Sequence, residues 1–419
     1  MQAILLHEIY SVFRSRRTPL HFSKCFEDVY RRLADDPEAL ALEAASSLHD
    51  SQKQTGATYY NDHAEGMMGG KMVGQDVICK QRLLLACYVL DQQHAALFGR
   101  RQTSCLGLSG MNLPFPQSQQ GWEAMPDQQA EIDHGWRSPS VEYYSPLYKV
   151  MSALSMMSKA SDDPHDAFQS FLVMACLTDP SHDLQAIDGA ADDDIDQPPI
   201  LRVVEQTPRT RLAFHTLMLC KHTPIQDLLA VVGESWCMAQ KLASSIEYRS
   251  AQREALLWAK GATNTNTGVD YSPESDQPPV HRALHHARQI IEILQQQPSR
   301  TGLHFEEWSI YLATLVIWAR AYVTSSEPPR QKSRRSTIPT LTEPRPPLHE
   351  LEQTVTAFLH AAPSSVPLSS SEVRNILLWT KAKIEKVDVP HSCGLTNDAV
   401  DVLSKLASRG ADRGWFEAV

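Results

Sequence analysis

The helical spacing of the apolar residues is the feature that most constrains how this chain folds. Near the N-terminus, Ile4, Leu5, Ile9, Val12 and Phe13 recur at the spacing of one helix face. Similar spacing recurs along the whole chain. The alternation of apolar and polar residues that marks a half-buried strand is hard to find. The sequence therefore predicts an all-α fold.

The chain begins inside a helix, and the same spacing predicts further helices over 24–47, 75–99, 143–159, 165–178, 208–221, 223–260, 281–297, 304–323, 347–361, 371–387 and 396–409. Two starts carry capping boxes, in which a hydroxyl and a Glu or Gln side chain cap the first backbone N–H groups. One is Thr223-Pro224 with Gln226, where the proline is expected at the first helical position. The other is Ser369 with Glu372. Gly410 predicts a C-terminal stop.

Five polar segments are expected to be flexible loops on one helical body, because they are rich in Gly, Pro or charge: 51–74, 107–140, 180–200, 262–279 and 324–347. Apolar helices continue to the C-terminus. We therefore expect one large helical domain over 1–419. The most apolar segment, residues 308–322, is too short to span a bilayer and contains Arg320, which predicts a buried helix and no membrane partner.

The net charge and the cysteines limit which functions and which cellular compartment the sequence allows. The 419 residues carry a formal net charge of −10 at pH 7, which argues against direct gripping of a nucleic-acid backbone. The eight cysteines are scattered, with no CxxC pair, which indicates a reducing compartment. The N-terminus lacks the basic region and the cleavage site of a signal peptide.

Three groups of residues could carry chemistry. The cluster ADDDID at 191–196 resembles the aspartates that hold magnesium against a diphosphate, but it lies between Gly189 and Pro198 and has no second motif downstream. His281 and His285 share a helix face, with His286 beside them, but HExxH lacks its glutamate here. A solvated loop and a surface helix explain these two groups more simply.

The third group is a stripe on the helix expected over 75–99, formed by Cys87, Asp91, His94 and Phe98. One stripe supplies neither an activating base for a nucleophile nor an oxyanion pocket. Nucleophile elbows, Walker loops, dinucleotide loops and zinc-finger spacings are absent from the sequence. We therefore expect no enzymatic activity: no catalytic residue, no cofactor-binding residue and no metal ligand in this chain.

Asp91 is expected to be a structural anchor. It lies among apolar residues, where an unpaired charge would cost several kcal/mol, so it needs a partner. Arg82, Arg100 and Arg101 are the basic candidates nearby, and we expect Arg100 to be that partner.

The stretch around Asp91 resembles the central motif of the fungal-specific transcription factor regulatory domain, also called the middle homology region. The matching residues are Tyr88-Val89-Leu90-Asp91, Leu97-Phe98-Gly99-Arg100, Leu113-Pro114-Phe115-Pro116 and Trp122-Glu123. The family's usual proline after Gly-Arg is Arg101 here.

Other parts of the chain are similar to the same family in register. These are the opening QAILLHEIYSVFRSRR, the segment HTPIQDLLAVVGESW (222–236), the segment WSIYLATLVIWARAY (308–322) and the end with Cys393-Gly394-Leu395 and Gly414-Trp415-Phe416. The second and last of these resemble the branch of the family that carries Cys2His2 zinc fingers.

The resemblance implies a regulatory domain that controls RNA polymerase II transcription in the nucleus. Its expected partners are the transcription machinery or co-regulator proteins, with a homodimer as one possible assembly. DNA binding and zinc are expected only through an N-terminal zinc module that is missing from this chain. The basic run RQKSRR (330–335) is a candidate nuclear localisation patch, although a solvated charged loop is the more common explanation of such runs.

Two alternatives stay open at this point. One is an all-α metal-dependent enzyme that uses the acidic segment 183–196. The other is a stand-alone helical co-regulator or scaffold, which would differ from the first interpretation in having no DNA-binding module in the gene product. The sequence upstream of Met1 in the transcript would separate a regulatory half from a free-standing domain.

Overall fold

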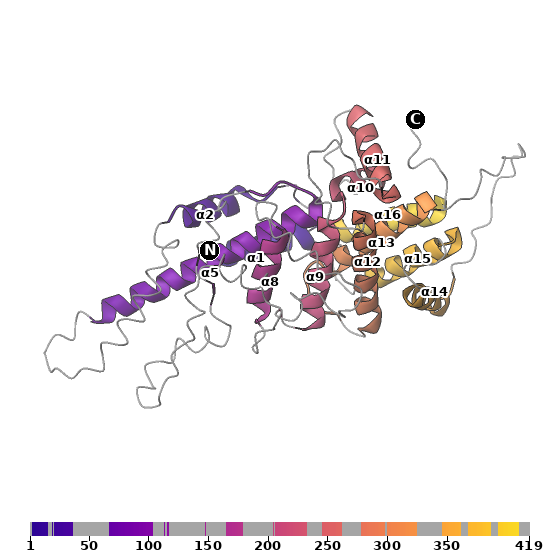
Figure 1. Cartoon of the computed structure of the whole chain (residues 1–419). Helices are drawn as coiled ribbons and strands as arrows, with labels where there is room; N and C mark the ends of the chain where they lie inside the picture. Colours follow the sequence, from indigo (N-terminus) through magenta and orange to yellow (C-terminus); the bar gives the residue numbers. More distant parts are fainter. Residues whose placement is uncertain are drawn as a thin grey trace, which may run out of the picture. The chain divides into compact units, whose positions relative to one another are not determined.

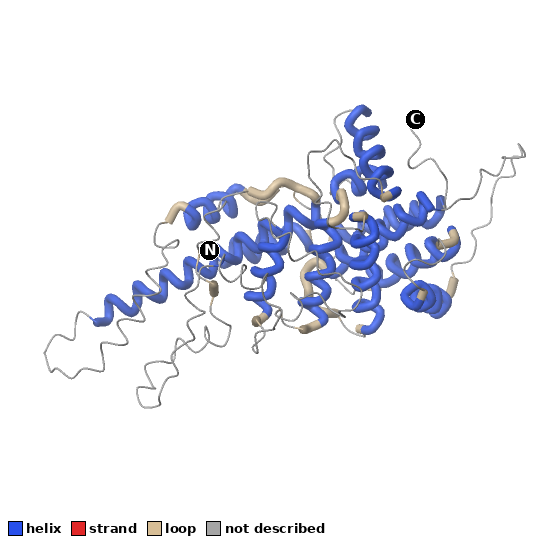
Figure 2. Tube along the Cα trace, viewed as in Figure 1, coloured by secondary structure: helices blue, strands red, loops and turns tan. Residues whose placement is uncertain are grey.

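The computed structural model describes most helical segments of the chain, and every regular element in the described residues is an α-helix (Figure 2). The all-α fold is therefore confirmed. The described residues are 2–15, 19, 21–36, 67–103, 113, 115–116, 147, 165–178, 204, 206–232, 245–261, 278–297, 300–324, 346–361, 368–386 and 393–409. The acidic segment 183–196 and the basic run 330–335 lie outside them.

Figure 1 shows the helices in chain order, and most of them begin and end within two residues of the predicted bounds. Their bounds are α1 Gln2–Phe13, α2 Lys24–Ala34, α5 Met67–Phe98, α8 Ala167–Thr178, α9 Pro208–Lys221, α10 Ile225–Val232, α11 Ser245–Lys260, α12 Pro279–Gln296, α13 Glu306–Thr324, α14 Leu348–His360, α15 Ser370–Glu385 and α16 Gly394–Arg409. Helix α2 ends at Ala34, so the helix expected over 24–47 was predicted too long, and the segment 223–260 contains two helices, α10 and α11. The helix expected over 143–159 lies outside the described residues except for Leu147.

One expected loop is partly helical. Helix α5 begins at Met67, so the prediction of a loop over 51–74 is wrong for its last eight residues, 67–74. Gly69, Gly70 and Gly74 each cost a helix about 1 kcal/mol relative to alanine, which is why the sequence favoured a loop. Once the apolar part of the helix is formed, adding residues at its end needs no new nucleus, and the helix tolerates that cost.

The two expected capping boxes have different outcomes. At α15 the Ser369 hydroxyl accepts from the Glu372 N–H, and the Glu372 carboxylate accepts from the Ser369 N–H, so this box is confirmed. At α10 the prediction is wrong, because the first helical residue is Ile225 and Pro224 lies just before it. The Thr223 hydroxyl is then one residue too early to cap, and it is buried without a hydrogen-bond partner among the described residues.

The sequence predicted one large helical domain, and the structure groups its helices into two compact units. Unit 1 contains residues 1–8, 22–95 and 100–211, and unit 2 contains residues 9–21, 96–99 and 212–419. Each unit is thus built from segments far apart in the sequence. The division falls inside α1, α5 and α9.

Unit 1 is organised around apolar helices that are joined by a few polar and cation–ring contacts. Helix α8 is buried on all sides from Gln169 to Leu177, as expected for a helix that is apolar all round. The Arg82 guanidinium of α5 lies over the Phe168 ring of α8, 4.8 Å from its centroid. The buried Glu8 carboxylate accepts from the backbone N–H of Ser23, the N-cap residue of α2, at 3.1 Å.

Unit 2 is centred on α13, which contacts α11, α12, α15 and α16 (Figure 1). Its residues from Glu307 to Ala319 are all buried, which confirms the buried helix expected over 308–322. Inside this core the Thr314 hydroxyl of α13 and the Thr380 hydroxyl of α15 share a hydrogen bond of 2.7 Å. Within the described residues, no helix has the length and apolarity needed to span a bilayer.

Candidate functional site

Helix α5 ends in a turn that needs glycine. Gly99 has φ +62°, the left-handed conformation that residues with a Cβ rarely adopt. Its N–H donates to Ala96 O, and the N–H of Arg100 donates to Ala95 O at 2.9 Å. These two bonds form a Schellman motif, which satisfies carbonyls that the end of the helix leaves open. The Gly-Arg pair singled out in the sequence is therefore a helix stop.

Four consecutive polar residues just before this turn are buried: Asp91, Gln92, Gln93 and His94, each at most 4 % exposed. Asp91 accepts two hydrogen bonds from the Thr103 N–H, at 3.0 and 3.1 Å, and one from the Thr103 hydroxyl at 3.0 Å. Gln92 Oε1 accepts from Gln102 Nε2 at 2.7 Å. The side chains of α5 thus hold the backbone that returns after the turn.

Asp91 is buried, as predicted. The prediction that Arg100 is its partner was wrong. Arg100 lies 3.3 Å from His94, Nη1 to Nε2. Because a guanidinium only donates, His94 Nε2 is the acceptor, and the imidazole carries its proton on Nδ1. Burial lowers the pKa of Arg100 to about 10. We call these residues the α5 clasp: Asp91, Gln92, His94, Arg100, Gln102 and Thr103.

The stripe weighed for nucleophilic chemistry has structural roles. Cys87 and Phe98 are at most 2 % exposed and belong to the core. Asp91 and His94 belong to the α5 clasp, and the His94 ring also packs on Phe22 at 4.5 Å between centroids. The clasp residues that the sequence did not reveal are Gln102 and Thr103, since neither belongs to a periodic pattern.

In unit 2, segments that carried the family resemblance meet at the last residues of α5. Trp308 Nε1 donates to Leu97 O at 3.0 Å, and its ring lies 5.5 Å from that of Phe98. Phe13 stacks on Phe98 at 6.0 Å. A Cβ added to Gly99 would lie 2.8 Å from the backbone nitrogen of Gln226.

The C-terminal segment reaches the same centre. Cys393 Sγ donates to Phe13 O at 3.0 Å, and the Gly394 N–H donates to Ser15 O at 2.9 Å. We call the assembled group the motif centre: Phe13, Leu97, Phe98, Gly99, Gln226, Trp308 and Cys393. Five segments from across the chain, all singled out in the sequence, pack against one another here.

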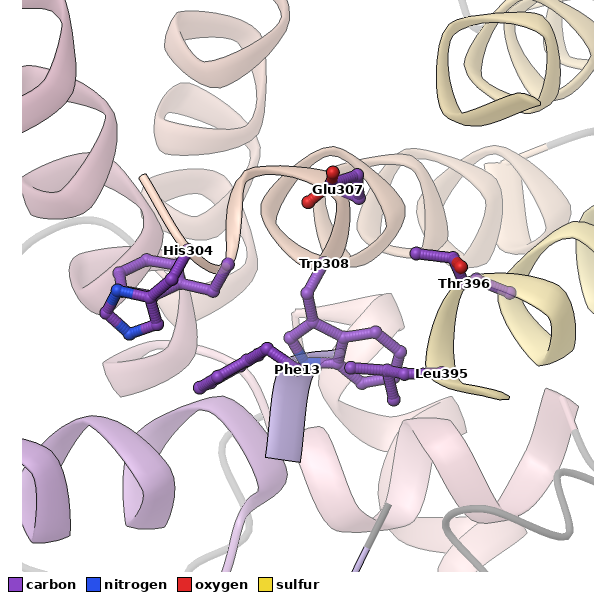
Figure 3. A pocket seen from close by; sticks show the side chains of 8 residues that line it. Phe13, His304, Glu307, Trp308, Leu395 and Thr396 are labelled. Atoms are coloured by element: carbon purple, nitrogen blue, oxygen red, sulfur yellow. The ribbon is translucent and has the colours of Figure 1, made fainter. Parts of the chain in front are cut away.

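A small cavity adjoins the motif centre (Figure 3), lined by Phe13, His304, Phe305, Glu307, Trp308, Leu395, Thr396 and Ala399. Figure 3 shows the Trp308 indole directed from α13 toward Phe13 and Leu395. The cavity volume is about 10 Å³, enough for a single water molecule. A cavity of this volume is too small for an organic ligand.

The carboxylate of Glu307 at this cavity is neutralised by two arginines. Its Oε1 accepts from Arg14 Nη1 at 3.0 Å and from Arg300 Nη2. Glu307 is 6 % exposed, so both ion pairs are partly shielded from solvent. The ion pairs join the turn after α1 and the residues before α13 to α13, and the Glu307 charge at the cavity has counter-charges.

The histidines weighed as metal ligands take two different environments. His281 and His285 lie on the exposed face of α12, whereas His286 is buried and contacts His215 of α9, Nδ1 to Nδ1, at 3.0 Å. Partial burial, with help from Arg320 and Arg288 respectively, lowers the pKa of His281 and of His285. Among the described residues, no three His, Cys, Asp or Glu side chains are arranged to hold a metal ion.

Asp227 of α10 is half-buried beside Glu254 of α11, and burial together with that like charge raises its pKa to about 6. The folded state therefore binds the Asp227 proton more tightly than the unfolded chain, whose aspartates titrate near pH 3.9. Stability consequently falls as pH rises from about 4 to about 6, and the loss persists above that range.

We expect Asp227→Asn to raise the free energy of unfolding by about 1 kcal/mol near neutral pH, a value discounted for solvent screening. The gain should vanish below about pH 4, where the wild-type carboxyl is protonated. Urea unfolding across this pH range measures both effects. The exposed Asp401→Asn is the matched control and should show no such pH-dependent gain. A constant gain at all pH values would rule out the charge as its cause.

In comparisons with known proteins, no family model, no curated protein and no solved structure matches the chain.

Proposed function

We propose that this chain is the regulatory domain of a fungal transcription factor and controls RNA polymerase II transcription from the nucleus through protein contacts. The observation that carries the proposal is the motif centre. Residues from five of the segments that resemble the family pack against one another there, so they serve one helical architecture. This is what a shared fold signature requires. Trp122-Glu123 and Gly414-Trp415-Phe416 lie outside the described residues.

The polar residues of these segments support a role without chemistry. The Asp91 carboxylate is occupied by Thr103, the Glu307 carboxylate by two arginines, and the adjoining cavity admits one water. A catalytic pocket would hold a substrate and present a polarised group to it. A rigid helical body that displays surfaces to co-regulators, and to a second copy in a homodimer, needs neither.

DNA contact is proposed to come from a zinc module outside this chain. The net charge of −10 is unfavourable for an independent grip on phosphates. In this proposal the chain controls the level of transcription, and the zinc module determines where the factor binds on DNA.

The test is to fuse the full chain to a DNA-binding domain of known operator and to measure a reporter gene in a fungal cell. We expect the fusion to change reporter output several-fold, in either direction, relative to the DNA-binding domain alone. The fusion should also accumulate in the nucleus.

Two outcomes would count against the proposal. A fusion that is folded, nuclear and bound to its operator, but leaves the reporter unchanged, would overturn it. If the chain changes the reporter only without a tether, by associating with an intact factor, the co-regulator alternative is the correct one. Far-UV circular dichroism of the purified chain establishes folding in each case.

A further inference from the structure

Unit 2 contains a buried contact between two imidazoles. His215 of α9 is 3 % exposed and His286 of α12 is 8 % exposed, and their Nδ1 atoms are 3.0 Å apart. The ring centroids lie 5.3 Å apart. The two residues are 71 positions apart in the sequence, so the contact ties α9 to α12.

The proton arrangement of this contact follows from the chemistry of imidazole. A hydrogen bond between two Nδ1 atoms requires that one carries a proton and the other offers a lone pair. If both rings are protonated, two N–H groups face each other and the hydrogen bond is lost. The contact therefore accepts at most one extra proton, and only as a buried cation, which burial disfavours.

Further aromatic rings surround the pair formed by His215 and His286. The His222 ring lies parallel to that of His286, 6.1 Å away, and the Phe214 ring meets both members of the pair edge-on. His285 lies beside the pair on α12, at 5.2 Å from His286 and 6.4 Å from His215.

The elements around α12 bring cations toward its histidines. Arg288 of α12 lies over the Phe358 ring of α14, and its charge opposes protonation of His285. Arg320 of α13 donates to Ala259 O of α11 at 2.8 Å, and its charge opposes protonation of His281. From α11, Trp258 Nε1 donates to His222 O at 2.8 Å. Both arginines thus oppose protonation of the exposed histidines of α12.

We propose that the contact between His215 and His286 is a pH-sensitive latch between α9 and α12, closed when the pair shares one hydrogen bond and opened when both rings are protonated. The latch gives unit 2 a response to acidification near the ordinary titration range of histidine, about pH 6.5. It is independent of the proposed transcriptional role.

The direction of the response follows from proton linkage. In the open state both imidazoles titrate freely near pH 6.5, whereas the closed state refuses at least one of the two protons. The open state therefore binds more protons as pH falls. Between about pH 7.5 and about pH 5.5, one refused proton lowers the closed-to-open ratio about tenfold.

Hydrogen–deuterium exchange of the full chain, corrected for the intrinsic pH dependence of amide exchange, tests the latch. We expect the protection of amides in 212–221 and 281–296 to fall about tenfold between these pH values, relative to amides in 371–385 of α15. His215→Asn should abolish this difference. Its amide can donate or accept at the place of Nδ1 without titrating, and His286 can then be protonated and donate to it.

His281→Asn, at an exposed histidine of the same helix, is the control and should keep the wild-type response. If His215→Asn does not fold, as judged by far-UV circular dichroism, His286→Asn tests the same hydrogen bond from the other side. Equal loss of protection in α9, α12 and α15 of the wild type would overturn the proposal. An unchanged response in a folded asparagine variant would overturn it as well.

Discussion

Gly99→Ala is expected to lower the free energy of unfolding by about 3 kcal/mol. The left-handed backbone at φ +62° costs an alanine about 1 kcal/mol or slightly more. The new Cβ would also lie 2.8 Å from the Gln226 nitrogen, and backbone cannot rotate away as a flexible side chain can. Displacing the start of α10 adds about 2 kcal/mol, the usual size of an overpacking penalty. Urea unfolding followed by far-UV circular dichroism measures the loss.

Gly302→Ala is the matched control for this prediction. Gly302 has φ +76°, similar to that of Gly99, but a Cβ there meets nothing within 4 Å. Only the backbone cost should appear, about 1 kcal/mol. The difference between the two variants therefore isolates the contact between the α5 turn and α10. Equal losses would mean that the two segments are not in contact at this turn.

Asp91→Ala is expected to destabilise the chain by about 3 kcal/mol, the upper range for hydrogen bonds to a charged group. The variant removes the acceptor of three hydrogen bonds and leaves the Thr103 N–H without its partner. The chain after Gly99 would lose one of its attachments to α5 and keep those through Gln102 and Arg100. Differential scanning calorimetry of the variant and the wild type records the change.

Thr103→Val separates the parts of this interaction, because it removes the hydroxyl bond and keeps the backbone N–H. We expect a loss of about 1 kcal/mol, and a double variant with Asp91→Ala should be less destabilised than the sum of the two. Asp401→Ala, at an exposed aspartate on α16, should change stability by less than about 0.5 kcal/mol. An Asp91→Ala chain as stable as the wild type would refute the anchoring role.

The positions of the helices were largely predictable, because helical periodicity depends only on residues that are close together in the sequence. Segment 208–221 is α9 to the residue, and the capping box at Ser369 marks the start of α15. The local rules failed where two signals competed. The glycines before Lys71 indicated a loop but lie inside α5, and Thr223 carried the residues of a capping box one position too early.

The functional residues were predictable only in part. The buried aspartate and the glycine stop of α5 follow from the local sequence, since a charge in an apolar run needs a partner and Gly-Arg follows the last periodic residue. The identity of each partner does not follow. Arg100 was the nearest basic residue after the turn. In the structure, however, Asp91 accepts hydrogen bonds from Thr103, and Arg100 contacts His94. His215 gave no signal, because a single histidine in an apolar helix has no pattern.

The sequence by itself determined the all-α class, most helix boundaries and the residues at which α5 must stop, because these depend on interactions within a few residues of the chain. Only the tertiary structure decided that Gly99 faces Gln226, that Trp308 holds Leu97 and that His215 meets His286. Each of these contacts joins residues at least 71 positions apart. Their geometry depends on how whole helices pack, and side-chain shape fixes that packing only once the helices have come together.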